Sequence, residues 1–152
     1  MHTIFVVEDN VVTSLLFKKY LETWQYNPKM FVDGQEAWEW VEPFLYVRPI
    51  FLITDLMMPK MDGLELCKKI RSTPYGSWSY LIMYTANEQS LALGNSLKLL
   101  SGVNEYLVKP VHATILKDKV ITGYRIFTEL SRNCDKMVAT KNQEFINNTH
   151  KL

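Results

Sequence analysis

The stretch Pro49–Gly63, PIFLITDLMMPKMDG, joins a short apolar run to a loop that carries proline and glycine. The run Ile50–Ile53 contains no polar residue, which is typical of a strand covered on both faces in a parallel α/β sheet. The run stops at Thr54 and Asp55. Because ligand crevices of open α/β sheets lie at the carboxyl ends of the strands, Asp55 is a candidate site residue.

Four other segments have the composition of strands, and three of them end at polar side chains. They are Thr3–Val7 before Glu8 and Asp9, Lys29–Val32, Tyr80–Tyr84 before Thr85, and Glu105–Val108 before Lys109. Helical patterns separate them: Asn10 as the N-cap of a helix to about Gln25, then Gln35–Val47, Gly63–Arg71, Gln89–Leu100 and a last helix from near Val111. We expect the apolar face of the first helix to comprise Val11, Leu15, Leu16, Tyr20 and Trp24.

Five strands that alternate with five helices predict an α/β fold with a doubly wound, five-stranded parallel sheet. The order 2-1-3-4-5, the flavodoxin-like (βα)5 arrangement, suits five strands and places the first strand beside the third. Glu8, Asp9, Asp55, Thr85 and Lys109 then converge on one edge of the sheet.

Length and composition indicate one globular domain outside the membrane. The 152 residues are 47% hydrophobic and 22% charged, and the net charge of +1 gives no field that would attract nucleic acid. The sequence contains no apolar run of the roughly 20 residues that a membrane span needs, and no signal-peptide pattern precedes the first strand. Two cysteines form no disulfide framework, so we expect a cytoplasmic protein.

Three neighbouring carboxylates repel one another and need a cation, and an oxygen site of this kind suits Mg²⁺, with Mn²⁺ as a substitute. Lys109 and Thr85 on the opposite side suit the oxygens of a transferring phosphoryl group. The chain has no glycine-rich phosphate cradle, so a bound nucleotide is not the expected donor. The phosphoryl group is expected to arrive on another protein.

The chain resembles the receiver domains of two-component response regulators, the family that includes the chemotaxis response regulator. The resemblance runs from about Thr3 to about Tyr124 and rests on motifs that occur in order at the strand ends. The matching stretches are Val6–Asn10 (VVEDN), Asp55–Gly63 (DLMMPKMDG), Tyr84–Asn87 (YTAN) and Gly102 through Glu105–Pro110 (EYLVKP).

The resemblance implies a role for each of these residues. Asp55 would accept a phosphoryl group from a histidine on a sensor kinase or a phosphotransfer protein. Asp9 would bind Mg²⁺ directly, Glu8 through water, and Met57 with its backbone carbonyl. Lys109 would contact the phosphoryl oxygens and precede a cis Pro110.

The resemblance also implies a switch made of Thr85 and Tyr106. The Thr85 hydroxyl would move toward the phosphoryl group while the Tyr106 ring turns inward, and this would alter the surface of the fourth helix, fifth strand and fifth helix. Such a protein is a signalling phosphoacceptor rather than an enzyme, because it assists only its own phosphorylation and dephosphorylation.

The helical pattern continues past the expected end of the receiver, so we assign residues 1–124 to the receiver domain and 125–152 to an extension of the fifth helix with a polar tail. Apolar residues recur every three or four positions, as in a coiled coil: Ala113, Leu116, Val120, Gly123, Phe127, Leu130, Cys134 and Met137. The extension is therefore either a dimerising or signal-carrying helix, or a fifth helix packed as far as Tyr124 and followed by a frayed tail.

Several functions remain open at this level. The residues after Asn133 are too few for a DNA-binding domain, so output through a downstream protein or an effector domain attached in a longer regulator is expected rather than direct nucleic-acid binding. The alternatives are a phosphorylation-independent receiver-like interaction or dimerisation domain, and a Mg²⁺-dependent phosphatase. A phosphatase would normally need an acid two residues after the nucleophile, where this chain has Met57.

Overall fold

Five parallel strands form the centre of the computed structural model, which describes residues 2–86 and 102–151. Their order is β2-β1-β3-β4-β5, which confirms the predicted doubly wound sheet. The strands are β1 (Thr3–Val7), β2 (Asn27–Phe31), β3 (Phe51–Asp55), β4 (Tyr80–Thr85) and β5 (Glu105–Val108). The second strand begins two residues earlier than predicted, at Asn27.

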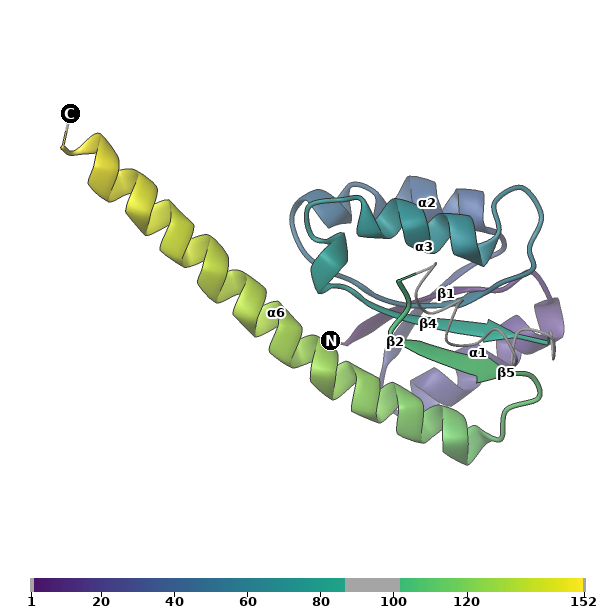
Figure 1. Ribbon diagram of the computed structural model, residues 1–152. Helices are drawn as coiled ribbons and strands as arrows, with labels where there is room; N and C mark the ends of the chain where they lie inside the picture. Colours follow the sequence, from purple (N-terminus) through teal and green to yellow (C-terminus); the bar gives the residue numbers. More distant parts are fainter. Residues whose placement is uncertain (1, 87–101, 152) are drawn as a thin grey trace.

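Helices cover both faces of this sheet. The helices α2 (Gly34–Val41) and α3 (Gly63–Arg71) lie on one face, and α1 (Val11–Thr23) and α6 (Ala113–Thr149) lie on the other (Figure 1). Two short 3-10 helices, η1 (Phe44–Tyr46) and η2 (Gly76–Trp78), precede β3 and β4. The helix that we predicted over Gln89–Leu100 lies outside the described residues. Within the part of the chain that is described, no helix is long and apolar enough to cross a membrane.

Side chains of the strands alternate between two apolar layers. Phe5, Val7, Leu52, Leu81 and Met83 pack under α2 and α3, whereas Ile4, Val6, Ile53, Ile82 and Tyr84 pack against α1 and α6. The central strand β3 is buried along its whole length. This burial on both faces explains why β3 has an uninterrupted apolar run instead of alternating polar and apolar residues.

Polar caps set the helix starts that position the site. The Asn10 side chain accepts a hydrogen bond from the Thr13 N–H at 2.9 Å, as predicted for the start of α1. Asp33 and Asp62 cap α2 and α3 in the same way. These caps fix the chain just beyond the carboxyl ends of β1, β2 and β3.

Two sequence predictions for the helices were wrong. The helix predicted over Gln35–Val47 ends at Val41, because Pro43 has no N–H to continue the helical hydrogen bonds. The apolar face predicted for α1 was displaced: Val11 and Leu15 are 72% and 62% exposed, whereas Phe17 and Leu21 are buried. The large Phe17 ring decides the orientation, because it packs edge-on against Tyr84 at a centroid distance of 4.8 Å.

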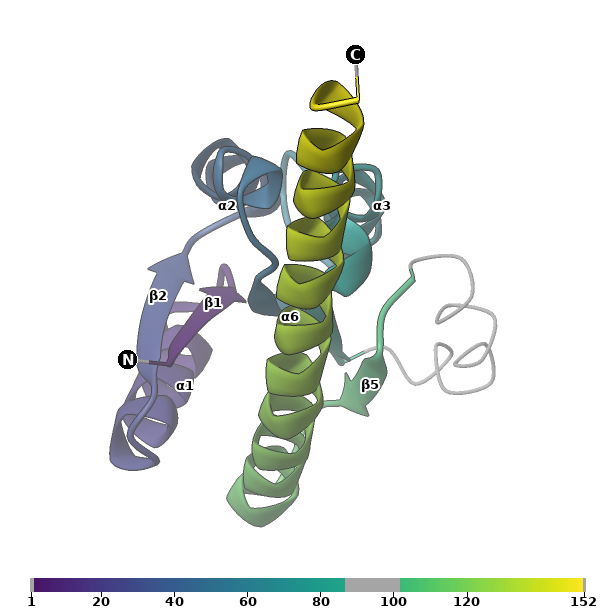
Figure 2. The same cartoon turned by 90° about the vertical axis from the view of Figure 1, so that its left-hand side faces the viewer.

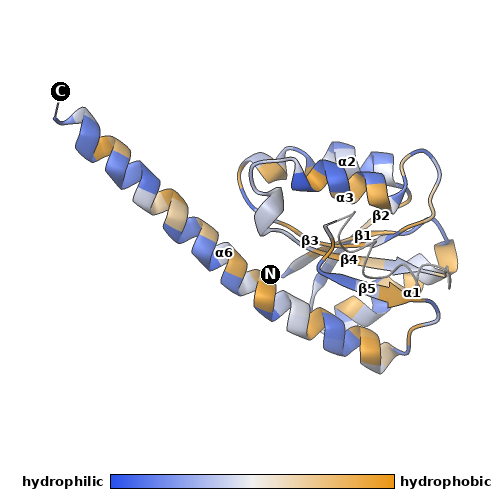
Figure 3. Cartoon of the chain, in the orientation of Figure 1, coloured by the Kyte–Doolittle hydropathy of each residue, from blue (hydrophilic) through white to orange (hydrophobic). Residues whose placement is uncertain are grey.

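The last helix is far longer than its contact with the sheet requires. It runs for 37 residues and projects beyond the edge of the sheet (Figures 1 and 2). Leu116, Val120, Gly123 and Cys134 are buried, whereas residues 139–151 are all exposed. Bands of apolar residues nevertheless recur along the projecting part (Figure 3).

Neither sequence alternative for this helix holds in full. Most of the apolar positions that suggested a coiled coil, as far as Cys134, face the protein's own sheet. The helix also does not fray after Tyr124, because it continues to Thr149. A partner helix could therefore contact only the part beyond Cys134 along this seam.

Gly123 allows α6 to approach the sheet closely, and this supports a prediction for stability. A Cβ atom there would lie 2.6 Å from Tyr80 Cε1 and 3.3 Å from Phe51 Cε2. We expect Gly123→Ala to lower the free energy of unfolding by about 1–2 kcal/mol, because the overlap outweighs the better helix propensity of alanine. Urea denaturation measures this change.

Thr122→Ala is the matched control, because Thr122 is exposed on the same turn of the helix. It should raise the unfolding free energy slightly through helix propensity alone. If Gly123→Ala stabilises the protein as much as Thr122→Ala does, the close packing of α6 on Tyr80 is contradicted.

Candidate functional site

Four strand ends meet at the carboxyl edge of the sheet. Glu8 and Asp9 follow β1, Asp55 ends β3, Thr85 ends β4, and Lys109 follows β5. Asp55 pairs in register with Tyr84, and Thr85 pairs with Val108, so these ends are level with one another. The Lys109 N–H donates to the Thr85 carbonyl at 2.7 Å, which extends the β4–β5 pairing to the site.

Three carboxylates gather at this edge. One oxygen from each of Glu8, Asp9 and Asp55 lies within 4.8 Å of the other two. Glu8 and Asp55 are 2% and 6% exposed, whereas Asp9 is exposed. Burial raises the pKa of Glu8 and the charge of Asp55 raises it further, against the opposing hydrogen bond from Lys109.

Lys109 neutralises part of this charge. Its Nζ lies 2.8 Å from Asp55 Oδ2 and 3.0 Å from Glu8 Oε2, and 4.9 Å from the centroid of the Tyr84 ring. Burial lowers the pKa of Lys109, but the bonds to the two carboxylates outweigh burial, so the pKa is raised overall. The Lys109–Pro110 peptide bond is cis, as expected.

The loop after β3 fixes the orientation of Asp55. Its Oδ1 accepts a hydrogen bond from the Met57 N–H at 3.3 Å, while its Oδ2 pairs with Lys109. The loop returns so closely that a Cβ at Gly63 would overlap the Asp55 carbonyl oxygen, and the Gly63 N–H donates to Leu56 at 2.9 Å. Only glycine fits this return. The Met57 side chain is 66% exposed beside the site.

This geometry agrees with the comparisons with known proteins. The family model for the response regulator receiver domain matches residues 4–121. The chain belongs to the response regulator receiver domain family. It is 34% identical over 118 residues to chemotaxis protein CheY1 of Helicobacter pylori, an alignment that covers 77% of this chain and 92% of that protein.

Solved receiver structures share the fold. The receiver domain of sensor histidine kinase PA1611 from Pseudomonas aeruginosa PAO1, with a magnesium ion coordinated in its active site cleft, is 27% identical with a TM-score of 0.68, covering 84% of this chain and 98% of that one. Response regulator TrrA from Thermotoga maritima, in complex with Mg²⁺-BeF, is 27% identical with a TM-score of 0.67, covering 81% of this chain and 99% of that one.

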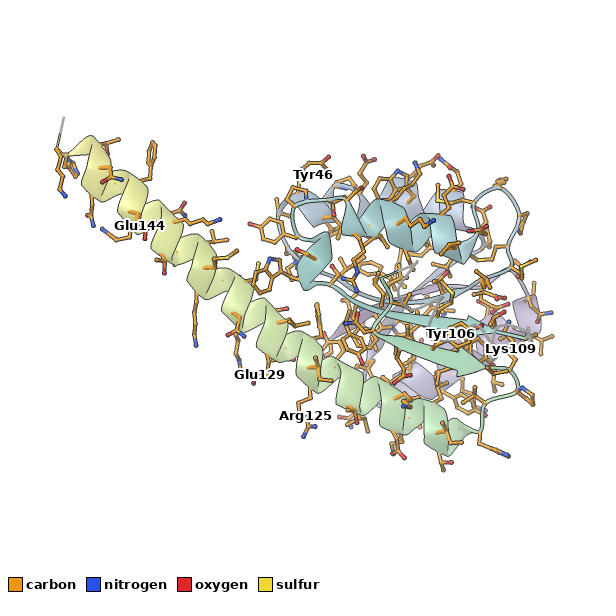
Figure 4. The ribbon with its side chains drawn as sticks, viewed as in Figure 1. Tyr46, Tyr106, Lys109, Arg125, Glu129 and Glu144 are labelled. Atoms are coloured by element: carbon orange, nitrogen blue, oxygen red, sulfur yellow. The ribbon has the colours of Figure 1, made fainter. Side chains whose placement is uncertain are left out.

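The two residues expected to form the receiver's switch lie on neighbouring strands. Thr85 is buried at the end of β4, and Tyr106 lies in β5 (Figure 4). The Tyr106 ring packs against the layer beneath α2 and α3. Its hydroxyl is buried, with no hydrogen-bond partner among the described residues. The ring is thus on the inward side in this structure.

Sequence reasoning missed two features of this receiver. The first is the ion pair between Glu8 and Lys109, which no pattern in the sequence could indicate because the residues are 101 positions apart. The second is an exposed apolar patch on α1 beside the acidic cluster. It comprises Val11, Val12, Leu15 and Leu16. The signal was present, because this helix has more apolar residues than one face can bury.

The buried Glu8 carboxyl predicts how stability depends on pH in the absence of metal. Its pKa is higher in the folded protein than its ordinary value of 4.5, so the folded state holds the proton more tightly. Stability therefore falls as pH rises above 4.5 through the folded pKa. Glu8→Gln removes this loss. As pH rises, the free energy of unfolding of the variant should therefore increase relative to that of the wild type, by about 1.4 kcal/mol for each unit by which the pKa of Glu8 is raised.

Urea denaturation in EDTA at several pH values between 4.5 and 7 measures this difference. Glu22→Gln, which removes an exposed acid on α1, serves as the control and should follow the wild type. A gap between Glu8→Gln and wild type that stays constant or shrinks as pH rises would show that burial does not penalise the Glu8 charge.

Proposed function

We propose that Asp55 accepts a phosphoryl group from a phosphohistidine on a sensor histidine kinase or a histidine phosphotransfer protein. The observation that supports this proposal is the position of the Asp55 carboxylate, buried at the end of β3 between the Lys109 ammonium and two further carboxylates. In the transfer, an oxygen of Asp55 forms a bond to phosphorus as the histidine N–P bond breaks, and the electron pair of that bond returns to the imidazole.

The residues present fit a hard divalent cation. We assign Glu8, Asp9, Asp55 and the Met57 backbone carbonyl to Mg²⁺, with Mn²⁺ as a substitute, because these are the oxygen ligands that both ions accept. When bound, the ion supplies positive charge to the phosphoryl oxygens. It also relieves the repulsion among three carboxylates that Lys109 alone offsets only in part.

Lys109 is positioned to bind an oxygen of Asp55 before the transfer and the phosphoryl group on Asp55 after it. Its ammonium contacts Asp55 Oδ2 at 2.8 Å before transfer, and it is positioned to pair with a phosphoryl oxygen afterwards. The raised pKa keeps this group charged throughout the neutral range. Met57 N–H donates to the other Asp55 oxygen and so keeps the carboxylate from rotating.

Thr85 and Tyr106 form the proposed switch. The Thr85 hydroxyl would hydrogen-bond to a phosphoryl oxygen, and the inward position of the Tyr106 ring would be favoured once Thr85 has moved. Phosphorylation would thereby select one of two packings of β5 and α6. The fourth helix, which completes the expected output surface, falls in the part of the chain that is not described.

The partners follow from this assignment. The apolar patch of Val11, Val12, Leu15 and Leu16 borders the acidic cluster and suits contact with the phosphodonor protein. Output would pass to a downstream protein or to an attached effector domain through β5 and α6, and the projecting end of α6 can also join two copies. We infer a cytoplasmic signalling protein that does not bind nucleic acid directly and is not an enzyme toward other molecules.

The chain divides by role under this proposal. Residues 1–124 would make up the receiver domain, and residues 125–152 would carry its last helix away from the domain as an extension with a polar end. The segment 132–141 suits contact with solvent or a polar partner surface, because its four charged residues are exposed. They are Arg132, Asp135, Lys136 and Lys141.

Intact mass spectrometry tests the phosphoacceptor directly. Incubation with acetyl phosphate and Mg²⁺ should add one phosphoryl group to the wild type and none to Asp55→Asn, because the amide oxygen is a poor nucleophile. EDTA should abolish the gain. If the wild type gains no phosphate from acetyl phosphate or from a phosphorylated histidine donor, and does not bind Mg²⁺, a phosphorylation-independent interaction domain takes the place of this proposal.

The switch is tested with a pair of substitutions at Thr85. Thr85→Ala should still be phosphorylated but should not change hydrogen–deuterium exchange in the β5 peptide on phosphorylation, because the hydroxyl is missing. Thr85→Ser keeps the hydroxyl and should respond like the wild type. An unaltered exchange response in Thr85→Ala would remove Thr85 from the switch.

A further inference from the structure

Two hollows meet at the amino-terminal edge of the sheet, the edge opposite the acidic site. The larger has a volume of about 360 Å³ and lies between the starts of β1 and β3 and the helix α6. The smaller, of about 180 Å³, continues toward α2. Thr3, Phe5 and Arg48 line both hollows, so the two form one groove.

The groove exists because β1 and β3 are not paired at their starts. Thr3 and Ile4 pair only with β2, and the pairing of β1 with β3 begins at Phe5 opposite Leu52. Pro49 and Ile50 pass beside this gap, and α6 crosses it at Phe127, Ser131 and Asp135. The extension of α6 beyond Tyr124 therefore supplies one wall.

Aromatic side chains line both hollows of the groove. Phe5, Phe51, Tyr124 and Phe127 line the larger hollow, and Trp40 and Phe44 line the smaller one. The Trp40 and Phe44 rings are stacked, with centroids 5.3 Å apart and planes 19° apart, and Trp40 is 44% exposed. A flat apolar group would find several ring faces and edges here.

Two cations line the smaller hollow, and no acid does. Lys29 Nζ lies 4.7 Å from the Trp40 ring centroid, and the Arg48 guanidinium lies 4.9 Å from that of Phe44. Neither cation forms an ion pair with any described residue. The rings hold both cations in place while their N–H groups remain available to an anion.

We propose that this groove binds a small anion that carries a flat ring. The anionic group, a phosphate, sulfonate or carboxylate, would lie between Lys29 and Arg48, and the ring would lie against Phe5 and Phe127 in the larger hollow. Ser131 and Asp135 can hydrogen-bond to polar atoms on the far side of the ring. The size of the larger hollow is at the lower end of the range for small-molecule sites.

Binding here would act on α6 rather than on Asp55. The ligand would contact the sheet through Phe5 and Arg48 and contact α6 through Phe127 and Ser131, so it would tie the projecting helix to the edge of the sheet. No residue of the acidic cluster lines the groove, so the ligand would not contact the phosphorylation site directly.

Fluorescence titration with two matched dyes tests the proposal on the full chain. 1-Anilinonaphthalene-8-sulfonate carries the sulfonate, and N-phenyl-1-naphthylamine has the same rings without a charge. The wild type should bind the sulfonate dye several-fold more tightly than the neutral dye. Arg48→Gln should weaken binding of the sulfonate dye about fivefold or more and leave binding of the neutral dye nearly unchanged.

Two further variants locate the site. Ser131→Trp places an indole in the larger hollow and should weaken binding of both dyes. Lys18→Gln removes an exposed cation on α1 that does not line the groove, so it should change neither affinity. Far-UV circular dichroism shows that each variant is folded.

Three results would overturn the proposal. In the first, the wild type does not bind the sulfonate dye. In the second, Lys18→Gln weakens binding of the sulfonate dye as much as Arg48→Gln does. In the third, Ser131→Trp binds both dyes as tightly as the wild type does.

Discussion

The Lys109 ammonium, held between Asp55 and Glu8, is the interaction on which the carboxyl edge of the sheet depends. It joins the end of β5 to the ends of β3 and β1, although these strands are not neighbours of β5 in the sheet. Two largely buried carboxylates at this edge would otherwise face each other without compensation. The same pairing leaves negative charge in excess, because one ammonium faces three acids.

Burial divides the acids into two kinds. Glu8 and Asp55 are enclosed, whereas Asp9 remains in contact with solvent. The helix N-cap at Asn10 and the tight return at Gly63 hold the two enclosed acids in position. The site is therefore a product of local turn geometry as much as of the sheet.

The sheet could be predicted from the sequence because its strands are short apolar runs that end at polar residues, and this pattern also located the candidate site. The orientation of α1 could not be predicted in the same way. Its sequence has two overlapping apolar faces, and tertiary contacts, among them that of Phe17 with Tyr84, select the face that carries Phe17 and Leu21. The sequence showed that the helical pattern of α6 continues past Tyr124. It could not show that α6 packs closely on the sheet, because the contact of Gly123 with Tyr80 joins residues that are far apart in the chain. The groove at the opposite edge lies where the starts of β1 and β3 are unpaired, and the pattern of apolar and polar residues does not indicate where strand pairing begins.

Figure 4 shows Arg125 and Glu129 on α6 near the edge of the sheet and Glu144 far beyond it. The helix starts at Ala113, only four positions after Lys109, so its first turn is coupled to the acidic edge through a very short segment. At 1.5 Å per residue its 37 residues span roughly 55 Å. A tilt of about 5° at the first turn would displace the far end by roughly 5 Å. Because Leu116, Val120 and Gly123 pack on the sheet, a tilt that begins at the acidic edge must also shift these contacts before it displaces the tip of the helix.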